Sequence, residues 1–461
     1  MSFFKAYDMR GTFGVDFNLA MVRSIGRHLP AVVRKYNAAA HCDTPPGRRF
    51  RALIGRDGRK TSPAIATELA AGLAEAGAEV VDMGLVTTPM VYFFTAEEDF
   101  DCSVMITASH NPPSDNGLKV SRRGALPMGY ESGLAELERL VKLAPLPDVV
   151  TPQEVQGVPT DAERLAKYVG WLKAHGAFDA EASGLNFAVD CSDGAASVLA
   201  HELFGERAVY LNDVIDGEFS HHSPNPLQAS AREQLVKVVR ERQLDCGVIF
   251  DGDADRCMFV DERGEFVQPD YLIPVLADTF AERGAVIHDV RTSRAAIEHL
   301  AAEGFRPVIG KVGHAYAKVL LRETKAICGG ELAGHYYFRD FHFCDSGCLA
   351  ALRILGAFAE AKREGRQVSA MLAPINRKYA NSGEMNFKVE DKPAAIRRIL
   401  AVAATLGVET GRSELDGYRL EFAEGWISIR QSNTEPYLRL IVECTTEQGL
   451  EKWRQALTSV I

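Results

Sequence analysis

The sequence predicts an α/β protein with three related doubly wound domains followed by a smaller α+β domain. Three observations carry this prediction. At 461 residues the chain is too long for one hydrophobic core, so several domains are expected. A strand–helix–strand pattern recurs three times before residue 376. The final segment alternates strand, helix and strand instead, and ends in a helix expected from Glu447.

The first strand–helix–strand unit lies between residues 52 and 84. A short apolar strand, residues 52–54, ends in the turn GRDGR, and a helix with alanine and leucine on one face is expected from Pro63 to Ala76. Gly77 ends this helix, and the strand EVVDMG follows. The same order returns in NFAVDCSDGAASVLAHELF and again in AVIHDVRTSRAAIEHLAAEG.

Composition marks the expected domain boundaries. The proline-rich stretch 142–160 separates the first unit from a helix that starts near Asp161, and residues 366–380 lead as a linker into the final segment. We therefore expect four domains, at residues 1–158, 159–265, 266–376 and 377–461.

Bulk composition excludes several classes of protein. The chain is 46% hydrophobic and 25% charged, which is typical of globular domains, and its net charge of -10 argues against general attraction to nucleic acid or an anionic membrane. An anionic small substrate needs only a local cluster of Arg and Lys. Nine scattered cysteines, an odd number, disfavour a secreted disulfide framework. Without an N-terminal apolar h-region or a membrane-spanning run, a cytoplasmic location is expected.

The strongest local signal is the acidic turn DGDADR, residues 251–256, between two strands expected at CGVIF and CMFV. Asp251, Asp253 and Asp255 alternate along this turn and supply hard oxygen ligands that suit Mg²⁺ or Ca²⁺. A solvated acidic turn is disfavoured, because crowded carboxylates repel one another and a cation relieves that repulsion. We therefore expect a divalent metal site.

An EF-hand is the sharper alternative for the same residues. The three aspartates and Glu262 occupy positions 1, 3, 5 and 12 of the EF-hand pattern. Position 6, however, holds Arg256 where an EF-hand needs glycine, and the flanking segments are strands. The EF-hand interpretation is therefore rejected.

A serine loop occurs in TASHNPPSDNGLKV, residues 107–120, directly after the expected strand CSVMI. Ser109 stands beside His110, two prolines fix the chain behind them, and Gly117 allows a tight turn before Lys119. A serine at a rigid loop tip, next to a histidine and near a lysine, is a candidate nucleophile. Taken alone, a Ser-His pair in a loop rich in Asn and Pro is usually ordinary turn chemistry. The G-x-S-x-G pattern of hydrolases is absent.

The segment RQSNTEP, residues 430–436, is a candidate phosphate cradle. Arg430 offers a guanidinium fork, and Ser432, Asn433 and Thr434 add two hydroxyls and an amide within one turn. An ordinary Asn/Thr turn is the alternative, and the arginine is what favours the cradle.

The segment GGELAGHYYF, residues 329–338, is a candidate sugar loop. Its glycines permit close backbone approach, and Glu331 and His335 can then face a polyol. A glycine-rich hairpin turn explains the same residues equally well.

Six segments, in order along nearly the whole chain, resemble the α-D-phosphohexomutase family, and within it the bacterial phosphomannomutases. They are FKAYDMRG (4–11), TASHNPP (107–113), DGDADR (251–256), VGHAYAK (312–318), GGELAGH (329–335) and RQSNTEP (430–436). This ordered set is far more specific than any one of its motifs.

The resemblance implies four domains around a central cleft, each contributing one loop. It implies that Ser109 carries a phosphoryl group and that Mg²⁺ is held by that phosphate with Asp251, Asp253 and Asp255. The resemblance further implies that the serine is surrounded by Tyr7, Arg10, His110 and Lys119, with Lys119 or His110 serving in proton transfer, and that Arg256 binds phosphate. The residues that it implies at the sugar are His314, Glu331 and His335. Those that it implies at the distal phosphate are Arg430, Ser432, Asn433 and Thr434.

The resemblance implies that the protein is a phosphohexomutase, which interconverts hexose 6-phosphate and hexose 1-phosphate through a 1,6-bisphosphate. Mannose phosphate is the first substrate expected, and glucose phosphate is a further one. Hexose 1,6-bisphosphate would be the activator. A phosphoglucosamine mutase and a non-catalytic phosphosugar- or metal-binding protein are the alternatives. The sugar loop commonly reads Gly-Glu-x-Ser-Gly-His, but Ala333 stands at the serine position here, which bears on sugar preference more than on the reaction.

Overall fold

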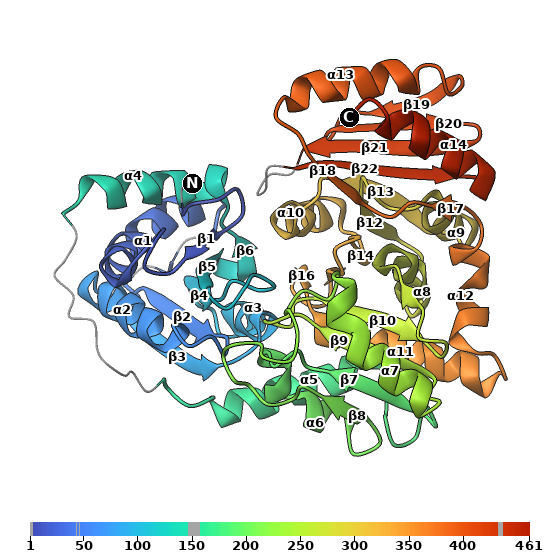
Figure 1. Ribbon diagram of the computed structural model, residues 1–461. Helices are drawn as coiled ribbons and strands as arrows, with labels where there is room; N and C mark the ends of the chain where they lie inside the picture. The colour runs from blue at the N-terminus through green and yellow to red at the C-terminus, as the bar shows by residue number, and fades with distance from the viewer. Residues whose placement is uncertain (1–2, 43, 46, 146–156, 432–436) are drawn as a thin grey trace.

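The computed structural model of the chain describes residues 3–42, 44–45, 47–145, 157–431 and 437–461. Four sheets follow one another along the sequence, each accompanied by helices from the same stretch of chain (Figure 1). We number these units I to IV. The prediction of three α/β units and a smaller α+β unit is confirmed.

Unit I has a mixed sheet with the strand order β1-β5-β4-β2-β3, and β6 pairs with β5. β2 runs parallel to β3 and β4, whereas β5 is antiparallel to β4, so the chain reverses at the serine loop. The elements are β1 (Met9–Thr12), α1 (Leu19–Ala39), β2 (Arg51–Arg56), α2 (Ser62–Glu75), β3 (Glu79–Leu85), α3 (Thr88–Glu97), β4 (Cys102–Ile106), β5 (Asp115–Arg122), β6 (Leu126–Pro127) and α4 (Ala135–Leu143).

Gly117 does not form the predicted tight turn. It lies inside β5, opposite Arg10 of β1. A Cβ atom at this position would lie 2.2 Å from the carbonyl oxygen of Met9. Glycine is therefore needed for the close approach of two strands, and the turn prediction is wrong because strand pairing, which the local sequence does not report, continues through this residue.

Unit II has the strand order β11-β10-β9-β7-β8. β7 is parallel to β8 and β9, and β10 is antiparallel to β9, so the acidic turn joins two adjacent strands as predicted. The elements are α5 (Ala162–Gly176), β7 (Phe187–Asp190), α6 (Ala200–Phe204), β8 (Val209–Leu211), α7 (Glu233–Glu241), β9 (Cys246–Phe250), β10 (Cys257–Asp261) and β11 (Phe266–Val267). Asp161 caps α5 by accepting a hydrogen bond from the Arg164 N–H, which explains why this helix starts where the sequence predicts.

Unit III has the strand order β13-β12-β14-β15-β16, with parallel pairing around β12 and antiparallel pairing beyond β14. The elements are α8 (Leu272–Asp278), β12 (Ala285–Asp289), α9 (Arg294–Ala302), β13 (Arg306–Gly310), α10 (His314–Thr324), β14 (Cys328–Gly330), β15 (Tyr336–Phe338), β16 (Cys344–Asp345), α11 (Gly347–Arg363) and α12 (Val368–Asn376). The linker expected at residues 366–380 therefore contains a helix, α12. Its buried residues Val368, Leu372 and Ile375 recur at helical spacing, and the burial of this apolar face stabilises the helix.

Unit IV is built on an antiparallel sheet with the order β17-β22-β21-β20-β19, and β18 also pairs with β22. The elements are β17 (Ala380–Asn381), β18 (Met385–Lys388), α13 (Lys392–Ala403), β19 (Glu409–Ser413), β20 (Tyr418–Phe422), β21 (Gly425–Gln431), β22 (Tyr437–Cys444) and α14 (Glu447–Thr458). Both helices share one apolar cluster with this sheet, and α14 begins at Glu447 as predicted.

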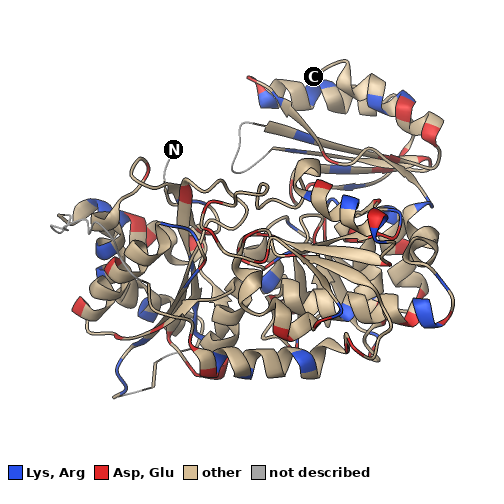
Figure 2. Ribbon diagram, turned by 60° about the horizontal axis from the view of Figure 1, so that its bottom comes forward, with Lys and Arg blue, Asp and Glu red and all other residues tan. Residues whose placement is uncertain are grey.

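The surface and the cysteines complete the fold. Basic and acidic residues are interspersed along the outer helices (Figure 2). All nine cysteines are free thiols, and eight of them are buried. Among the residues that the structure describes, no helix combines the length and the apolar character needed to cross a bilayer.

Candidate active site

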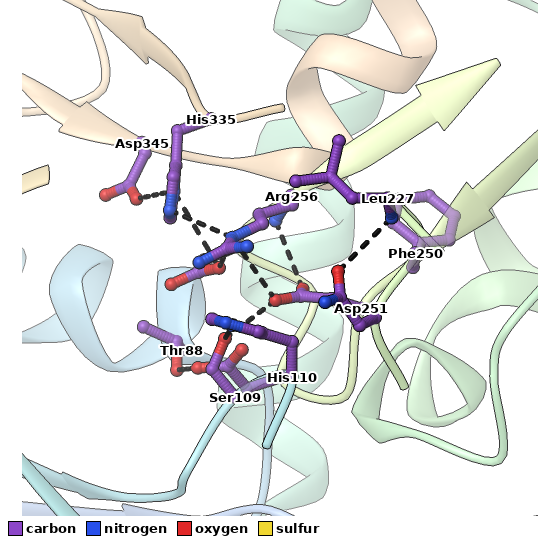
Figure 3. A network of polar contacts seen from close by, with 12 residues as sticks. Thr88, Ser109, His110, Leu227, Phe250, Asp251, Arg256, His335 and Asp345 are labelled. Carbon is purple, nitrogen blue, oxygen red and sulfur yellow. Dashed lines mark hydrogen bonds and ion pairs between the residues drawn. The ribbon is translucent and has the colours of Figure 1, made fainter. Parts of the chain in front are cut away.

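The candidate site forms where loops of units I, II and III meet. The serine loop, residues 107–115, joins β4 to β5; the acidic turn joins β9 to β10; and the candidate sugar loop joins β14 to β15. Figure 3 shows Ser109 and His110 pointing toward Asp251, with Arg256 beside it and His335 and Asp345 beyond. Residues far apart in sequence thus reach one buried centre.

The acidic turn buries three carboxylates completely. Asp251, Asp253 and Asp255 are 0% exposed, and each places an oxygen within 4.8 Å of the others. Gly252 allows the turn to approach the serine loop, because a Cβ there would lie 2.6 Å from the carbonyl oxygen of Ser109. The backbone of the acidic turn therefore packs directly against the backbone of Ser109.

Cations partly offset the charge of this triad. Lys119 Nζ lies 2.7 Å from Asp253 Oδ2 and 2.5 Å from Asp255 Oδ2, and the Thr88 hydroxyl donates to Asp253 at 2.6 Å. Burial opposes ionisation of Lys119 and of Asp255, but the attraction between opposite charges prevails. The charges of Asp253 and then Asp255 raise the pKa of Lys119, and the Lys119 charge lowers the pKa of Asp255. Lys119 is consequently a fixed ammonium.

The triad still has unused ligand capacity. Burial, and then the neighbouring Asp255 and Asp253, raise the pKa of Asp251 well above its ordinary value, as expected for carboxylates without enough positive charge nearby. Asp253 Oδ1 and Asp255 Oδ1 are buried and accept no hydrogen bond from any residue that the structure describes. A hard divalent cation fits this oxygen set and would supply the missing charge.

Ser109 adopts an uncommon backbone conformation at the tip of its loop. Its φ is +50°, in the left-handed region, and the residue is 1% exposed. Oγ donates a hydrogen bond to Asp251 Oδ2 at 2.7 Å and lies 3.4 Å from His110 Nδ1. Burial, then the Arg256 and Arg10 charges, lower the pKa of His110 well below its ordinary value, so its imidazole is neutral.

Two further predicted residues border this centre from β1 and the segment before it. Arg10 donates to Asp8 Oδ2 at 2.6 Å and to Asn111 Oδ1 at 3.1 Å, which ties it to the serine loop. The Tyr7 hydroxyl donates to the Val312 carbonyl at 3.1 Å, and its ring lies edge-on to His314 with centroids 6.2 Å apart. Tyr7 therefore connects units I and III.

The candidate sugar loop is a hairpin turn, and it also carries its two polar residues into the site. Glu331 Oε1 accepts from the Gly313 N–H at 2.6 Å, and its Oε2 accepts from the Tyr337 hydroxyl at 2.6 Å. His335 Nε2 accepts from Arg256 Nε at 3.0 Å, while Nδ1 lies 2.8 Å from Asp345 Oδ2. The two interpretations left open by the sequence are therefore compatible.

Behind this loop lies a buried ionic group that sequence reasoning missed. Lys318 Nζ is 2.7 Å from Asp345 Oδ1, and both residues are at most 1% exposed. Lys318 stands one helical turn after His314 in α10, so helical spacing was a usable signal for it. Asp345 and Thr88 carry no local motif and become visible only through their partners.

Arg430 lies on β21 of unit IV. Its Nη2 is 2.7 Å from Asp416 Oδ2, which also accepts from the Val312 N–H at 2.9 Å. Arg430 thus approaches the VGHAYAK segment of unit III across a shared carboxylate. Ser432, Asn433 and Thr434 lie outside the described residues.

Comparison with known protein families divides the chain into the same four units. The sequence matches the family descriptions phosphoglucomutase/phosphomannomutase alpha/beta/alpha domains I, II and III over residues 1–142, 162–264 and 268–379, and its C-terminal domain over residues 384–460. The chain belongs to the phosphoglucomutase/phosphomannomutase family. The resemblance read from the motifs is confirmed, and with it the assignment as an isomerase of the phosphotransferase mutase kind.

Individual family members match over nearly their full length. The chain is 35% identical to a phosphomannomutase of Vibrio cholerae over 452 residues, which cover 95% of this chain and 94% of the relative. It is 32% identical to a phosphomannomutase/phosphoglucomutase of Pseudomonas aeruginosa, covering 98% and 93%. A crystal structure of a family protein from Burkholderia thailandensis matches with a TM-score of 0.82 and 28% identity, covering 99% of this chain and 97% of the other.

Proposed function

We propose that this chain interconverts hexose 6-phosphate and hexose 1-phosphate, with mannose phosphate as the main substrate and glucose phosphate as a second one. The observation that carries the proposal is the 2.7 Å contact between Ser109 Oγ and the buried Asp251 carboxylate, inside a cluster of three aspartates and Lys119. A nucleophilic oxygen held against a candidate metal site suits phosphoryl transfer, which depends on positioning and charge neutralisation. We propose the domain limits 158, 265 and 376 for the units that carry these loops.

The acidic turn is proposed to hold Mg²⁺ through Asp251, Asp253 and Asp255, together with the phosphate carried on Ser109. When bound, the ion neutralises negative charge on the phosphoryl group. A phosphoserine adds a charge of about -1.5 to -2 at neutral pH, so cations beside it are required. Arg256 and Lys119 provide the protein's own share, since both already pair with these carboxylates.

The proposed transfer breaks the bond between Ser109 Oγ and phosphorus and forms a bond from phosphorus to a sugar hydroxyl oxygen. The sugar hydroxyl loses its proton, and the departing Ser109 Oγ gains one, so a group is needed that can accept a proton and deliver it. Lys119 is poorly suited, because its ammonium already donates to two carboxylates. His110 is the better candidate, because its neutral imidazole can accept a proton and its Nδ1 lies 3.4 Å from Ser109 Oγ, the oxygen that must receive one.

The second half of the reaction returns the other phosphate to Ser109. The 1,6-bisphosphate must therefore present both ends to one serine, while a separate site holds the phosphate that is not transferred. For that separate phosphate site we propose Arg430 with Ser432, Asn433 and Thr434. For the sugar, which lies between the two phosphates, we propose His314, Glu331 and His335. Hexose 1,6-bisphosphate acts as activator by supplying the phosphate that loads Ser109.

Nine free thiols support a cytoplasmic location.

Two measurements test the proposal. Incubation with glucose 1,6-bisphosphate should add one phosphoryl group to the wild-type protein, seen by intact mass, and none to Ser109→Ala. A coupled assay should then give a higher kcat/KM for mannose 1-phosphate than for glucose 1-phosphate or glucosamine 1-phosphate. Highest activity on glucosamine 1-phosphate would favour a phosphoglucosamine mutase, and no turnover of any of the three would favour a non-catalytic binding protein.

A further inference from the structure

We infer that Arg59 is a positioning residue for phosphoryl transfer, because its guanidinium clamps the backbone of the serine loop and so sets the direction of Ser109 Oγ. The inference rests on the proposed role of Ser109. Arg59 lies in the GRDGR turn that follows β2, outside every segment considered above for catalysis or binding. Its side chain is 0% exposed.

All five N–H donors of the Arg59 guanidinium are used, and four of them end on one loop. Nη2 donates to the carbonyl oxygens of Ser109 and Asn111 at 2.7 and 2.8 Å. Nη1 donates to those of Pro112 and Asp115 at 2.6 and 2.9 Å. Only a planar fork reaches several carbonyls in this way, so lysine cannot reproduce the contact set.

The fifth donor anchors the clamp to the framework of unit I. Arg59 Nε donates to Asp57 Oδ2 at 3.0 Å, and Asp57 is also fully buried. Asp57 Oδ1 in turn accepts from the Ser62 hydroxyl at 2.8 Å, and the Asp57 N–H donates to the Ile106 carbonyl at the end of β4. The guanidinium is therefore held in one orientation at the carboxyl ends of β2 and β4.

The conformation of Ser109 explains why a clamp is needed. A non-glycine residue with φ of +50° is held in a sparsely populated region and persists only where its surroundings over-determine it. The Ser109 N–H donates to the Thr107 hydroxyl at 2.8 Å, and its carbonyl accepts from Arg59, so both sides of the residue are fixed. With the backbone so constrained, Oγ points at Asp251.

The clamp also lies at the joint with unit II. The ring of Phe219 covers the guanidinium, with its centroid 4.9 Å from Arg59 Cζ. The same ring lies next to Gly252 of the acidic turn. Arg59 therefore holds the serine loop at the place where unit II presents the proposed metal ligands, and a small displacement there changes the alignment of Oγ with them.

A buried arginine can also serve folding alone, and the test must separate the two roles. We compare Arg59→Lys with Arg48→Lys. Arg48 is a matched control in unit I, because its fork likewise binds a buried carboxylate, Asp101, and a carbonyl, that of Asp99, away from the serine loop. Each protein is loaded with radiolabelled phosphate from glucose 1,6-bisphosphate and mixed with mannose 1-phosphate in a single-turnover experiment.

We expect the maximal transfer rate of Arg59→Lys to fall about 100-fold, the size of effect produced by a misplacement of about 1 Å. The half-saturating sugar concentration should change by less than about threefold, because distal phosphate and sugar contacts are untouched. Arg48→Lys should transfer at the wild-type rate. Thermal unfolding of each variant reports any loss of folding separately.

Wild-type transfer rates in folded Arg59→Lys, or an equal rate loss in Arg48→Lys, overturn the clamp. If Arg59→Lys does not fold, Asp57→Asn takes its place, since it removes the charge that orients the guanidinium and keeps the side-chain volume; a wild-type rate in that variant also overturns the inference. Absence of label on wild-type Ser109 would instead overturn the proposed function.

Discussion

The two ends of the candidate site are joined to the rest of the molecule in different ways. Around the serine end, units I, II and III share one apolar cluster, and Phe93, Tyr168 and Phe341 bring one ring from each unit together at centroid distances of 5.4 to 6.2 Å. At the Arg430 end, unit IV has an apolar cluster of its own, without members from the other units among the described residues.

Polar contacts connect unit IV to unit III. Arg294 Nη2 donates to Glu421 Oε2 at 2.6 Å, and Arg419 Nη1 donates to the Val290 and Thr292 carbonyls at 2.9 and 2.7 Å. Ion pairs and hydrogen bonds exchange for water at a small net cost, whereas opening an apolar joint exposes its surface. We therefore expect the serine end, which units I to III hold together, to be the rigid part of the site, and unit IV to reorient more readily around a substrate.

The largest expected effect is at the rigid end. Asp253→Ala removes a proposed metal ligand and leaves Lys119 and Thr88 without a shared partner. We expect kcat/KM to fall at least about 1,000-fold, as for loss of a central electrostatic group in an active site. Steady-state kinetics across a Mg²⁺ titration measure this. Asp261→Asn, at the end of β10, is the control, and Asp253→Ala activity near wild type without metal would contradict the proposed site.

The next prediction concerns the joints. Phe341→Ala should lower stability by about 3–5 kcal/mol, because it empties a buried aromatic site shared by three units. Arg294→Ala should cost about 1–2 kcal/mol, because its lost contacts are polar and partly solvated. Hydrogen exchange followed by mass spectrometry locates each effect. Faster exchange should spread through units I to III in the first variant and stay near unit IV in the second; the reverse pattern would contradict the comparison.

A smaller loss of activity is expected at the Arg430 end. Arg430→Ala removes a charge-assisted hydrogen bond to the phosphate that is not transferred, worth about 1.5–3 kcal/mol, or roughly 10- to 150-fold in kcat/KM. Phosphate loading of Ser109 should persist. Arg412→Ala, on the exposed β19 of the same unit, is the matched control. An unchanged kcat/KM for Arg430→Ala would place the distal phosphate elsewhere.

The smallest effect is expected from Ala333→Ser. A restored hydroxyl adds one neutral hydrogen bond, worth about 0.5–1.5 kcal/mol, to a loop whose stronger acceptor is the Glu331 carboxylate. kcat/KM for mannose and glucose phosphates should therefore change by similar small factors, measured with both sugars in parallel. Large and opposite changes would show that position 333 selects between the epimers.

The sequence by itself determined the local features. Apolar runs bounded by turn residues predicted β4, β9 and β10, so the loops carrying Ser109 and the aspartate triplet were placed correctly between strands. The end of the proline-rich stretch 142–160 predicted the start of α5 near Asp161. The linker prediction is wrong for much of residues 366–380, where burial of one apolar face forms α12. These features depend on neighbours a few residues apart, which is the range over which local sequence carries information.

Only the tertiary structure decided which side chains meet. Asp345 reaches His335 through the pairing of β15 with β16, Asp416 reaches Arg430 between two strands of unit IV, and Thr88 reaches Asp253 across two units. Arg59 is the clearest example of a contact that the sequence does not reveal. The segment GRDGR is typical of an ordinary turn, and only the structure shows that Arg59 donates to four carbonyls of the serine loop. A hydrogen bond needs atoms about 3 Å apart in a defined direction, and packing of the sheets sets that distance while spacing along the chain does not.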